Sequence, residues 1–248
     1  FLQSKFCLAE IITYRVLKVA ELGESRVDDA IGHLIHSSKN PTVGVLAHPG
    51  QVDIRITAKA TDENAAHKLI LPIENQVRRI LGQHIFATDD QTMEDTIRKL
   101  LTFQRKTISA YEDLTGGLVA SRLQESNPKF FIGGIIGNTS AKTDRLLKFS
   151  LGQDASADTT LDPADFTRRM AKAIRSLTES NLGIALHAIA DPADKSENLA
   201  GGQTYIAITN GTEFVQRDYN YGGLGLPDRT RMSFNAIELL RSALINNL

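Results

Sequence analysis

Two adjacent glycines end a run of acidic and polar residues, EDLTGG at positions 112–117, between a predicted strand and a predicted helix. Residues that follow a strand often line the ligand site of an α/β sheet, and a helix start offers free N–H groups to an anion such as phosphate. Gly116 and Gly117, together with Thr115, would let a ligand approach the backbone closely. A tight turn with positive φ explains these glycines equally well, so both interpretations stay open.

The glycine-rich stretch 133–143, GGIIGNTSAKT, is a second candidate for chemistry, because it holds a serine and a lysine two residues apart. Ser140 and Lys142 have the residue types of a nucleophile and its amine base. Within a helix, however, residues two apart point about 200° away from each other and cannot share a proton. We therefore expect Thr139 or Ser140 to cap a helix whose lysine is solvated.

Three further residues are candidates for ligand contacts. Asp191 lies at the end of a predicted strand, where it could bind a ligand hydroxyl, although an Asp-Pro pair such as Asp191-Pro192 more often forms a turn. Arg229 and Arg231 precede the last predicted helix. Arginines at this place could bind a phosphate. More commonly, however, arginines near the start of a helix are solvated and form surface salt bridges.

The composition narrows the class of protein. The 248 residues include 28 Lys+Arg and 29 Asp+Glu, so no electrostatic attraction to nucleic acid or to an anionic membrane is expected. The longest apolar runs stay far below the roughly 20 residues of a membrane span. A single cysteine, Cys7, excludes an intrachain disulfide and indicates a reducing compartment, so we expect a cytoplasmic protein. His33 and His36 lack a third ligand nearby in sequence, and we expect neither a metal nor a cofactor.

The first part of the chain predicts a small helix–hairpin–helix–strand unit. A helix is expected over 24–37, strands over 42–46 and 52–58, a helix over 62–81 and a short strand over 84–87. Pro72 should kink or divide the second helix. This order resembles the KH-like module used on RNA. Because the segment lacks the Gly-x-x-Gly clamp and a basic face, we do not expect nucleic-acid binding and favour a spacer or dimerisation role.

From residue 92 onward, helices alternate with buried strands. Strands are expected over 107–111, 130–137, 182–190, 203–209 and 213–219, and helices over 93–105, 117–124, 139–149, from Asp162-Pro163 onward and over 231–245. This alternation predicts an α/β fold class: a small KH-like α+β module followed by a three-layer α/β/α domain with a mixed sheet.

Five short motifs, in this order and spacing, give the chain a family resemblance: LGES at 22–25, NPT at 40–42, RITA at 55–58, LTGGL at 114–118 and GG at 133–134. Over nearly its whole length the sequence resembles the CinA competence/damage-inducible family. The resemblance implies a remnant of an upstream domain or linker over 1–20, a KH-like module over 21–90 and a CinA C-terminal domain over 91–248. We expect a homodimer, and we expect the family's N-terminal molybdopterin-binding-like domain to be essentially missing from this sequence.

The C-terminal domain of that family is similar to nicotinamide mononucleotide amidohydrolase, which forms nicotinate mononucleotide and ammonia with a serine, a lysine and an assisting tyrosine. The resemblance places the serine, tyrosine and lysine at Asp113, Asn138 and Thr143, so all three residues are replaced. Losing one member of such a unit usually costs several orders of magnitude in rate. The expected function is a mononucleotide-binding or structural homologue without amidase activity. Alternatives are a hydrolase with Asp113 as general base and Asn138 positioning the substrate, and an amidohydrolase with a relocated Ser/Lys pair.

Overall fold

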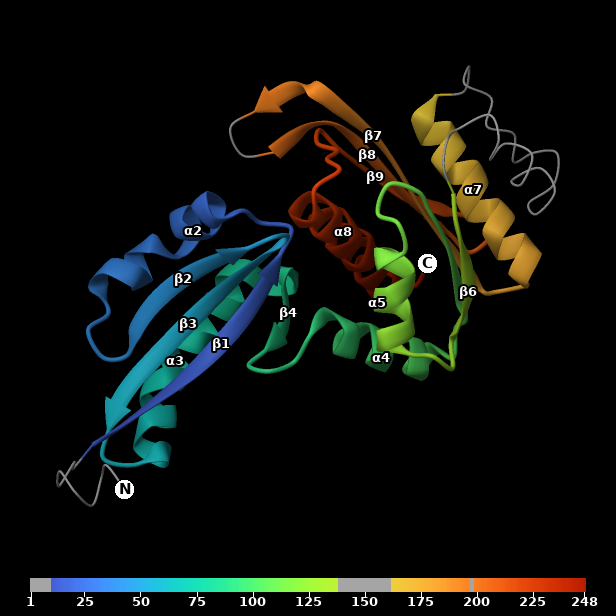
Figure 1. Cartoon of the computed structure of the whole chain (residues 1–248). Helices are drawn as coiled ribbons and strands as arrows, with labels where there is room; N and C mark the ends of the chain where they lie inside the picture. Colours follow the sequence, from blue (N-terminus) through green and yellow to red (C-terminus); the bar gives the residue numbers. More distant parts are fainter. Residues whose placement is uncertain (1–9, 138–161, 197–198) are drawn as a thin grey trace, which may run out of the picture. The chain divides into compact units, whose positions relative to one another are not determined.

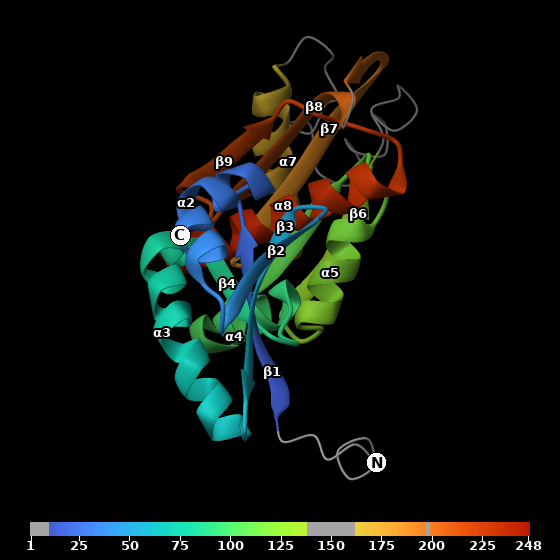
Figure 2. The same ribbon diagram turned by 90° about the vertical axis from the view of Figure 1, so that its left-hand side faces the viewer.

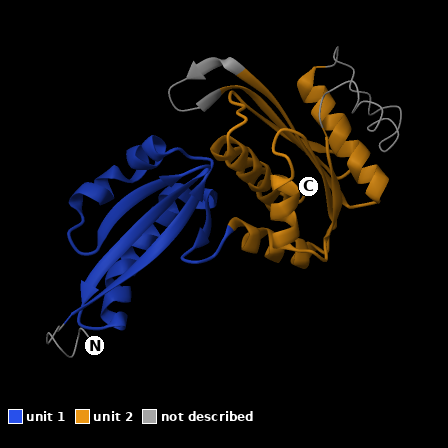
Figure 3. Cartoon of the chain, viewed as in Figure 1, with its two compact units in different colours: residues 1–92 blue, residues 93–248 orange. Residues whose placement is uncertain are grey.

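The computed structural model describes residues 10–137, 162–196 and 199–248. The chain divides into two compact units, Phe1–Thr92 and Met93–Leu248, which Figure 3 shows in two colours. Each unit is described by itself below.

The first unit is an antiparallel sheet with two helices on one face. Figure 1 shows its four strands in the order β2-β3-β1-β4. The elements are β1 (Ile11–Ala20), α2 (Glu24–Ser37), β2 (Thr42–His48), β3 (Gln51–Ala60), α3 (Glu63–Leu81), the short 3₁₀ helix η1 (Gly82–His84) and β4 (Ile85–Thr88). The two helices contact each other, and Figure 2 shows them on the same side of the strands.

Alternation of apolar and polar residues explains how this unit forms. In β3, Val52, Ile54 and Ile56 are buried, and the polar residues between them face away from the helices. Asp62 begins α3 as its N-cap, because its carboxylate accepts a hydrogen bond from the backbone N–H of Ala65 at 2.9 Å. α3 continues without a break from residue 63 to residue 81, so Pro72 does not divide the helix.

Residues 11–20 differ from the expected remnant or linker. They form β1, which pairs with β3 from Ile11↔Ala60 to Ala20↔Gln51 and with β4 on its other edge. Leu17 and Val19 are fully buried in the core of this unit. The strand was missed because its polar and apolar residues alternate only weakly at its start, and the pairing partner lies about 40 residues further along the chain.

The second unit is a mixed sheet between two helical layers. Its strand order is β6-β5-β7-β8-β9, with β6, β5 and β7 parallel and β8 and β9 antiparallel. The elements are α4 (Met93–Gln104), β5 (Ile108–Glu112), α5 (Leu118–Ser126), β6 (Phe131–Ile136), α7 (Pro163–Thr178), β7 (Leu182–Ser196), β8 (Leu199–Thr209), β9 (Phe214–Tyr219) and α8 (Leu226–Ile245).

The helices of the second unit cover both faces of its sheet (Figure 1). α7 contacts β5, β6, β7 and β8 on one face, whereas α5 and α8 contact the strands from the other face and α4 packs on α5 and α8. The expected α/β fold with a three-layer second domain and a mixed sheet is confirmed. The helix expected over 139–149 lies outside the described residues. None of the described helices combines the length and the apolar character that a membrane crossing requires.

Candidate functional site

Parallel pairing of β5 and β7 brings an aspartate and a histidine together. Glu112 of β5 lies opposite Leu186 of β7, so the next residue on each strand, Asp113 and His187, meets at the carboxyl end of the pair. Asp113 Oδ2 lies 2.5 Å from His187 Nδ1, and both side chains are more than nine-tenths buried. Ligand sites of open α/β sheets lie at this end of the strands.

Hydrogen bonds fix the orientation of the Asp113 carboxylate. Its Oδ1 accepts from the backbone N–H of Leu114 at 2.5 Å and of Ala188 at 3.1 Å, and its Oδ2 faces His187. A carboxylate oxygen only accepts hydrogen bonds, so His187 directs an Nδ1–H at Oδ2 of Asp113.

Aromatic side chains surround the imidazole ring. Phe166 of α7 meets His187 edge-on, with ring centroids 4.9 Å apart, and Tyr205 of β8 stacks on it at 6.2 Å with a 20° interplanar angle. Phe166 also meets the ring of Tyr111 edge-on at 6.1 Å. The rings of Phe166 and Tyr205 therefore restrict the orientation of the His187 imidazole.

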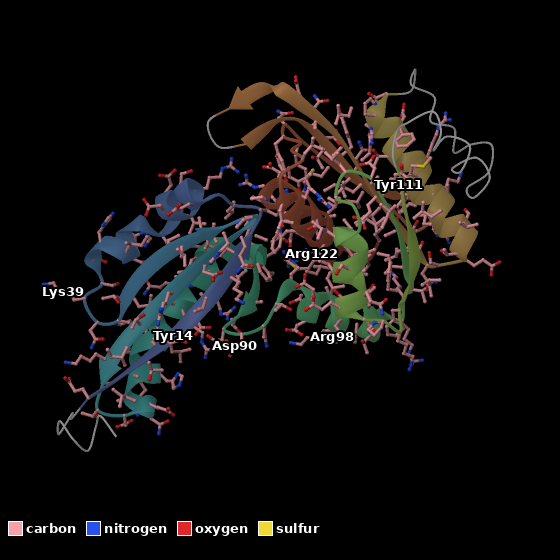
Figure 4. All side chains as sticks on the ribbon, viewed as in Figure 1. Tyr14, Lys39, Asp90, Arg98, Tyr111 and Arg122 are labelled. Atoms are coloured by element: carbon pink, nitrogen blue, oxygen red, sulfur yellow. The ribbon has the colours of Figure 1, made fainter. Side chains whose placement is uncertain are left out.

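Tyr111, labelled in Figure 4, lies on the same face of β5 as Asp113. Its hydroxyl is buried and has no hydrogen-bond partner within the described residues. Burial, and to a lesser extent the negative charge of Asp113, raises the pKa of Tyr111 above its ordinary value, so the hydroxyl stays protonated. A Cβ atom at position 137 would collide with this hydroxyl, which explains the glycine there. Tyr111 is therefore a buried donor beside the Asp113–His187 pair.

Glu112 points to the opposite face of β5, where its carboxylate caps the N-terminus of α5. Its carboxylate accepts from the Thr115 hydroxyl at 2.5 Å and from the backbone N–H groups of Val119 at 3.0 Å and Ala120 at 2.8 Å. Two of the N–H groups that we expected to be free for an anion are thus bound within the protein, and that expectation is wrong for them.

The Gly-Gly turn carries a bound arginine. Gly116 and Gly117 have φ values of +62° and +102°, so the explanation as a tight turn with positive φ is confirmed. Arg229 donates from Nε at 3.2 Å and from Nη2 at 2.7 Å to the carbonyl oxygen of Thr115. The structure therefore brings Thr115, Gly116 and Arg229 together, and Thr115 is fully buried.

The two predicted arginines lie inside a helix. α8 begins at Leu226, with Gly225 as N-cap and proline in the first turn, rather than at residue 231. Arg229 and Arg231 consequently lie in the first turns of α8. Arg231 places its guanidinium 5.5 Å from the centroid of the Tyr221 ring.

Asp191 does not end its strand. β7 continues to Ser196, with a change of register between Ala190 and Lys195, so the expected turn at Asp191-Pro192 is wrong. Asp191 is exposed.

The other predicted positions fall into two groups. Asn138 and Thr143 lie outside the described residues, as do Ser140 and Lys142. The described residues contain no group of three or more His, Cys, Asp or Glu side chains that could hold a metal ion.

His187 and the capping role of Glu112 were not predicted from the sequence. His187 is a single polar residue in the apolar run Ile184–Ile189, which is the one signal that could have singled it out. A polar residue inside a buried strand needs a partner, and the strand order that supplies Asp113 is not visible in the sequence.

The geometry defines a class of protein: an α/β domain with a buried polar cluster at the carboxyl ends of its parallel strands, preceded by a small α+β module. The chain belongs to the CinA family. The model of the damage-inducible protein CinA KH domain matches residues 14–87, and that of the CinA C-terminal domain matches residues 90–244.

Relatives and a solved structure agree with this assignment. A putative competence-damage inducible protein of Moorella thermoacetica is 34% identical over 80% of this chain and 48% of its own length. A CinA-like protein of Acaryochloris marina is 32% identical over 99% of this chain and 59% of its own length. The chain thus spans only about half to three fifths of these relatives. The crystal structure of the competence/damage inducible protein CihA from Agrobacterium tumefaciens is similar in fold, with a TM-score of 0.50, 22% identity, and coverage of 62% of this chain and 93% of the other.

Proposed function

We propose that the second unit binds a mononucleotide and lacks the serine–lysine amidase chemistry of nicotinamide mononucleotide amidohydrolase. The observation that carries this proposal is the state of Asp113, which occupies the position that the family resemblance gives to the serine. Its two carboxylate oxygens face three nitrogen atoms, of Leu114, His187 and Ala188. A carboxylate held in this way cannot replace a serine hydroxyl that loses its proton to an amine.

The surroundings of the Gly-Gly turn support binding of an anionic ligand. Arg229 lies against Gly116 and makes no ion pair with the described acidic residues. A guanidinium group without a carboxylate partner is suited to a phosphate. The carboxylate of Glu112 already accepts hydrogen bonds from two backbone N–H groups at the N-terminus of α5. The phosphate contacts would therefore come from the arginines of α8 and not from these N–H groups.

The alternative of Asp113 as a general base on water has less support. A base needs a free lone pair within reach of the proton that it removes. Both oxygens of Asp113 already accept hydrogen bonds or contact the imidazole, and its side chain is 6% exposed.

Two measurements on the purified chain test the proposal. With nicotinamide mononucleotide we expect ammonia release at the level of the enzyme-free blank, and a melting temperature that rises with mononucleotide concentration by mass action. Arg229→Gln should raise at least tenfold the mononucleotide concentration that is needed for the same rise in melting temperature. Arg79→Gln, which removes an exposed arginine from α3 in the other unit, is the matched control and should leave the shift unchanged. Ammonia release above the blank, or no shift with any mononucleotide, would contradict the proposal.

A further inference from the structure

The strand β2 forms one end of the sheet in the first unit, and five of its seven residues are exposed (Figure 1). Backbone groups of alternate residues pair with β3, whereas those of the residues between them point away from the sheet. An edge of this kind is a template for another strand. We propose that β2 pairs antiparallel with β2 of a second copy of this chain, so that the two first units share one continuous sheet.

The composition of β2 lacks the features that usually protect an edge strand. Proteins block edge pairing with charged side chains, prolines, bulges or very short strands. Residues 42–48, TVGVLAH, contain no Asp, Glu, Lys, Arg or Pro, and they pair with β3 without a change of register. By contrast, the opposite edge strand β4 has only four residues, and the edge strand β9 of the second unit carries Arg217 and Asp218. β2 is therefore an edge that its own sequence leaves open to pairing.

The side chains on the face away from the helices fit a second copy of the same strand. Two identical antiparallel strands are related by a twofold axis. In the register centred on Val45, Leu46 of each copy lies opposite Gly44 of the other. Leu46 is 61% exposed, and a Cβ atom at Gly44 would meet no atom within 4 Å. The open space above the glycine of one copy therefore accommodates the leucine of the other.

On the face that carries the helices, the same register continues the apolar core. Val43 is buried in the core of the first unit, and Val45 packs against that core. Across the proposed seam, Val45 lies beside Val45 of the other copy, and Val43 lies opposite Ala47. Cross-strand pairs of this kind stabilise a sheet. The apolar layer beneath α2 would thus extend from one copy into the next.

Charge does not oppose the pairing of two identical β2 strands. Like charges directly opposite each other destabilise a strand pair. His48 is the one titratable residue of β2, and it lies 3.3 Å from Asp53 of its own chain. In the register centred on Val45, His48 lies opposite Thr42, so the two His48 side chains are at opposite ends of the seam.

The length of β2 sets the expected strength of the dimer. Stable protein interfaces bury about 1,200–2,000 Å² in total. A seam of two seven-residue strands is expected to bury less than this, so the dimer should dissociate on dilution. This weak association concerns the first unit and is independent of the mononucleotide site in the second.

Sedimentation velocity over a range of protein concentrations tests the proposal. For the unaltered chain we expect a sedimentation coefficient that rises with concentration from that of a monomer to that of a dimer. Leu46→Lys/Ala47→Lys adds two charges to exposed positions of the edge, and the charge at position 46 would face Arg55 next to Gly44 of the other copy. The double variant should raise the dissociation constant of the dimer at least tenfold.

Ile12→Lys is the matched control for added charge. Ile12 is 69% exposed on the central strand β1, on the same sheet face as Leu46, and it is not part of the edge. The control should leave the dissociation constant of the dimer unchanged.

Hydrogen exchange of the backbone amides locates the interface in the unaltered chain. Amides within residues 43–47 should exchange more slowly at concentrations where the dimer dominates than at concentrations where the monomer dominates. Amides within residues 85–88, on the opposite edge strand β4, should exchange at the same rate in both.

Three results would overturn the proposal. These are a chain that stays monomeric at every concentration, a dimer of unchanged dissociation constant in folded Leu46→Lys/Ala47→Lys, and a dimer without added protection at residues 43–47. If the double variant does not fold, hydrogen exchange of the unaltered chain decides. Mononucleotide binding is measured separately, so failure of this interface and failure of the proposed function are distinguishable.

Discussion

The two units differ in what they bury. Among the described residues of the first unit, the buried charged or polar side chains comprise Glu74 alone, and the rest of the core is apolar. The buried polar or charged residues of the second unit are Glu94, Ser109, Glu112, Asp113, Thr115, Ser126, Asn127, Thr167, Ser180, His187, Thr204, Thr209, Ser233, Glu238 and Arg241. Buried polar groups need hydrogen-bond partners, and an apolar core folds without them. Their concentration in the second unit therefore favours this unit as the location of a functional site.

The charged groups make the same contrast. Glu74 pairs with Arg15 and Arg78, and both arginines are partly exposed to solvent. In the second unit, Glu238 receives two hydrogen bonds from Arg241, at 2.8 and 2.6 Å, and both side chains are almost completely buried. Burial raises the pKa of Glu238 although its arginine partner acts in the opposite direction. The second unit therefore depends on partnered charges in a way that the first unit does not.

The largest expected effect comes from breaking the buried pair. Arg241→Met leaves Glu238 buried without its main partner and should lower the free energy of unfolding of the second unit by about 3–5 kcal/mol. Urea unfolding followed by circular dichroism measures this loss. The double variant Glu238→Leu/Arg241→Met removes both charges and should be close to the unaltered chain. A single variant as stable as the double variant would contradict the dependence on partnered charge.

The apolar core of the first unit predicts a different sensitivity. Ile54→Ala removes a fully buried side chain and should cost about 2–5 kcal/mol through lost burial and the cavity that remains. Ile12→Ala, in the same sheet, alters a side chain that is 69% exposed and should change stability by less than about 0.5 kcal/mol. If Ile54→Ala and Ile12→Ala lower the free energy of unfolding equally, the prediction is wrong, and the sheet face that carries Ile12 is covered in solution.

A carboxylate caps the N-terminus of a helix in each unit, Glu112 at α5 and Asp62 at α3, and the two caps differ in burial. Glu112→Gln at the start of α5 replaces a buried acceptor of three hydrogen bonds and should cost about 2 kcal/mol. Asp62→Asn keeps an oxygen for the Ala65 N–H at the exposed start of α3 and should have a clearly smaller effect. Thermal unfolding of both variants checks this order, and a reversed order would contradict it.

The smallest effect is the pH dependence of the exposed cap. The hydrogen bond from the Ala65 backbone lowers the pKa of Asp62 below its ordinary value. The stabilisation is therefore present above the unfolded pKa of about 3.9 and is lost as the pH falls through the lower folded value. The unaltered chain should lose stability relative to Asp62→Asn as the pH is lowered through this range, which urea unfolding at pH 6, 4 and 3 measures. A constant difference would exclude the capping contact.

Local patterns predicted most of the elements. The helix over 24–37 was predicted with its observed bounds, and the strands near 52–58 and 108–112 were predicted to within two residues. These elements rest on contacts between near neighbours: apolar spacing, Asp at a helix start and glycine at a turn. The candidate site was predicted less completely, because Thr115, Gly116 and Arg229 meet in the structure whereas Asp191 lies in a continuing strand.

The amino-acid sequence by itself determined the alternation of helices and strands and the place of two adjacent glycines between β5 and α5. The tertiary structure alone decided that β1 belongs to the first sheet, that Glu112 fills the start of α5, and that His187 holds Asp113. Asp113 and His187 are 74 residues apart in the chain and meet only because β5 and β7 pair in parallel. A residue's neighbours along the chain set its local conformation, whereas the partner of a buried polar group is fixed by which strands lie side by side.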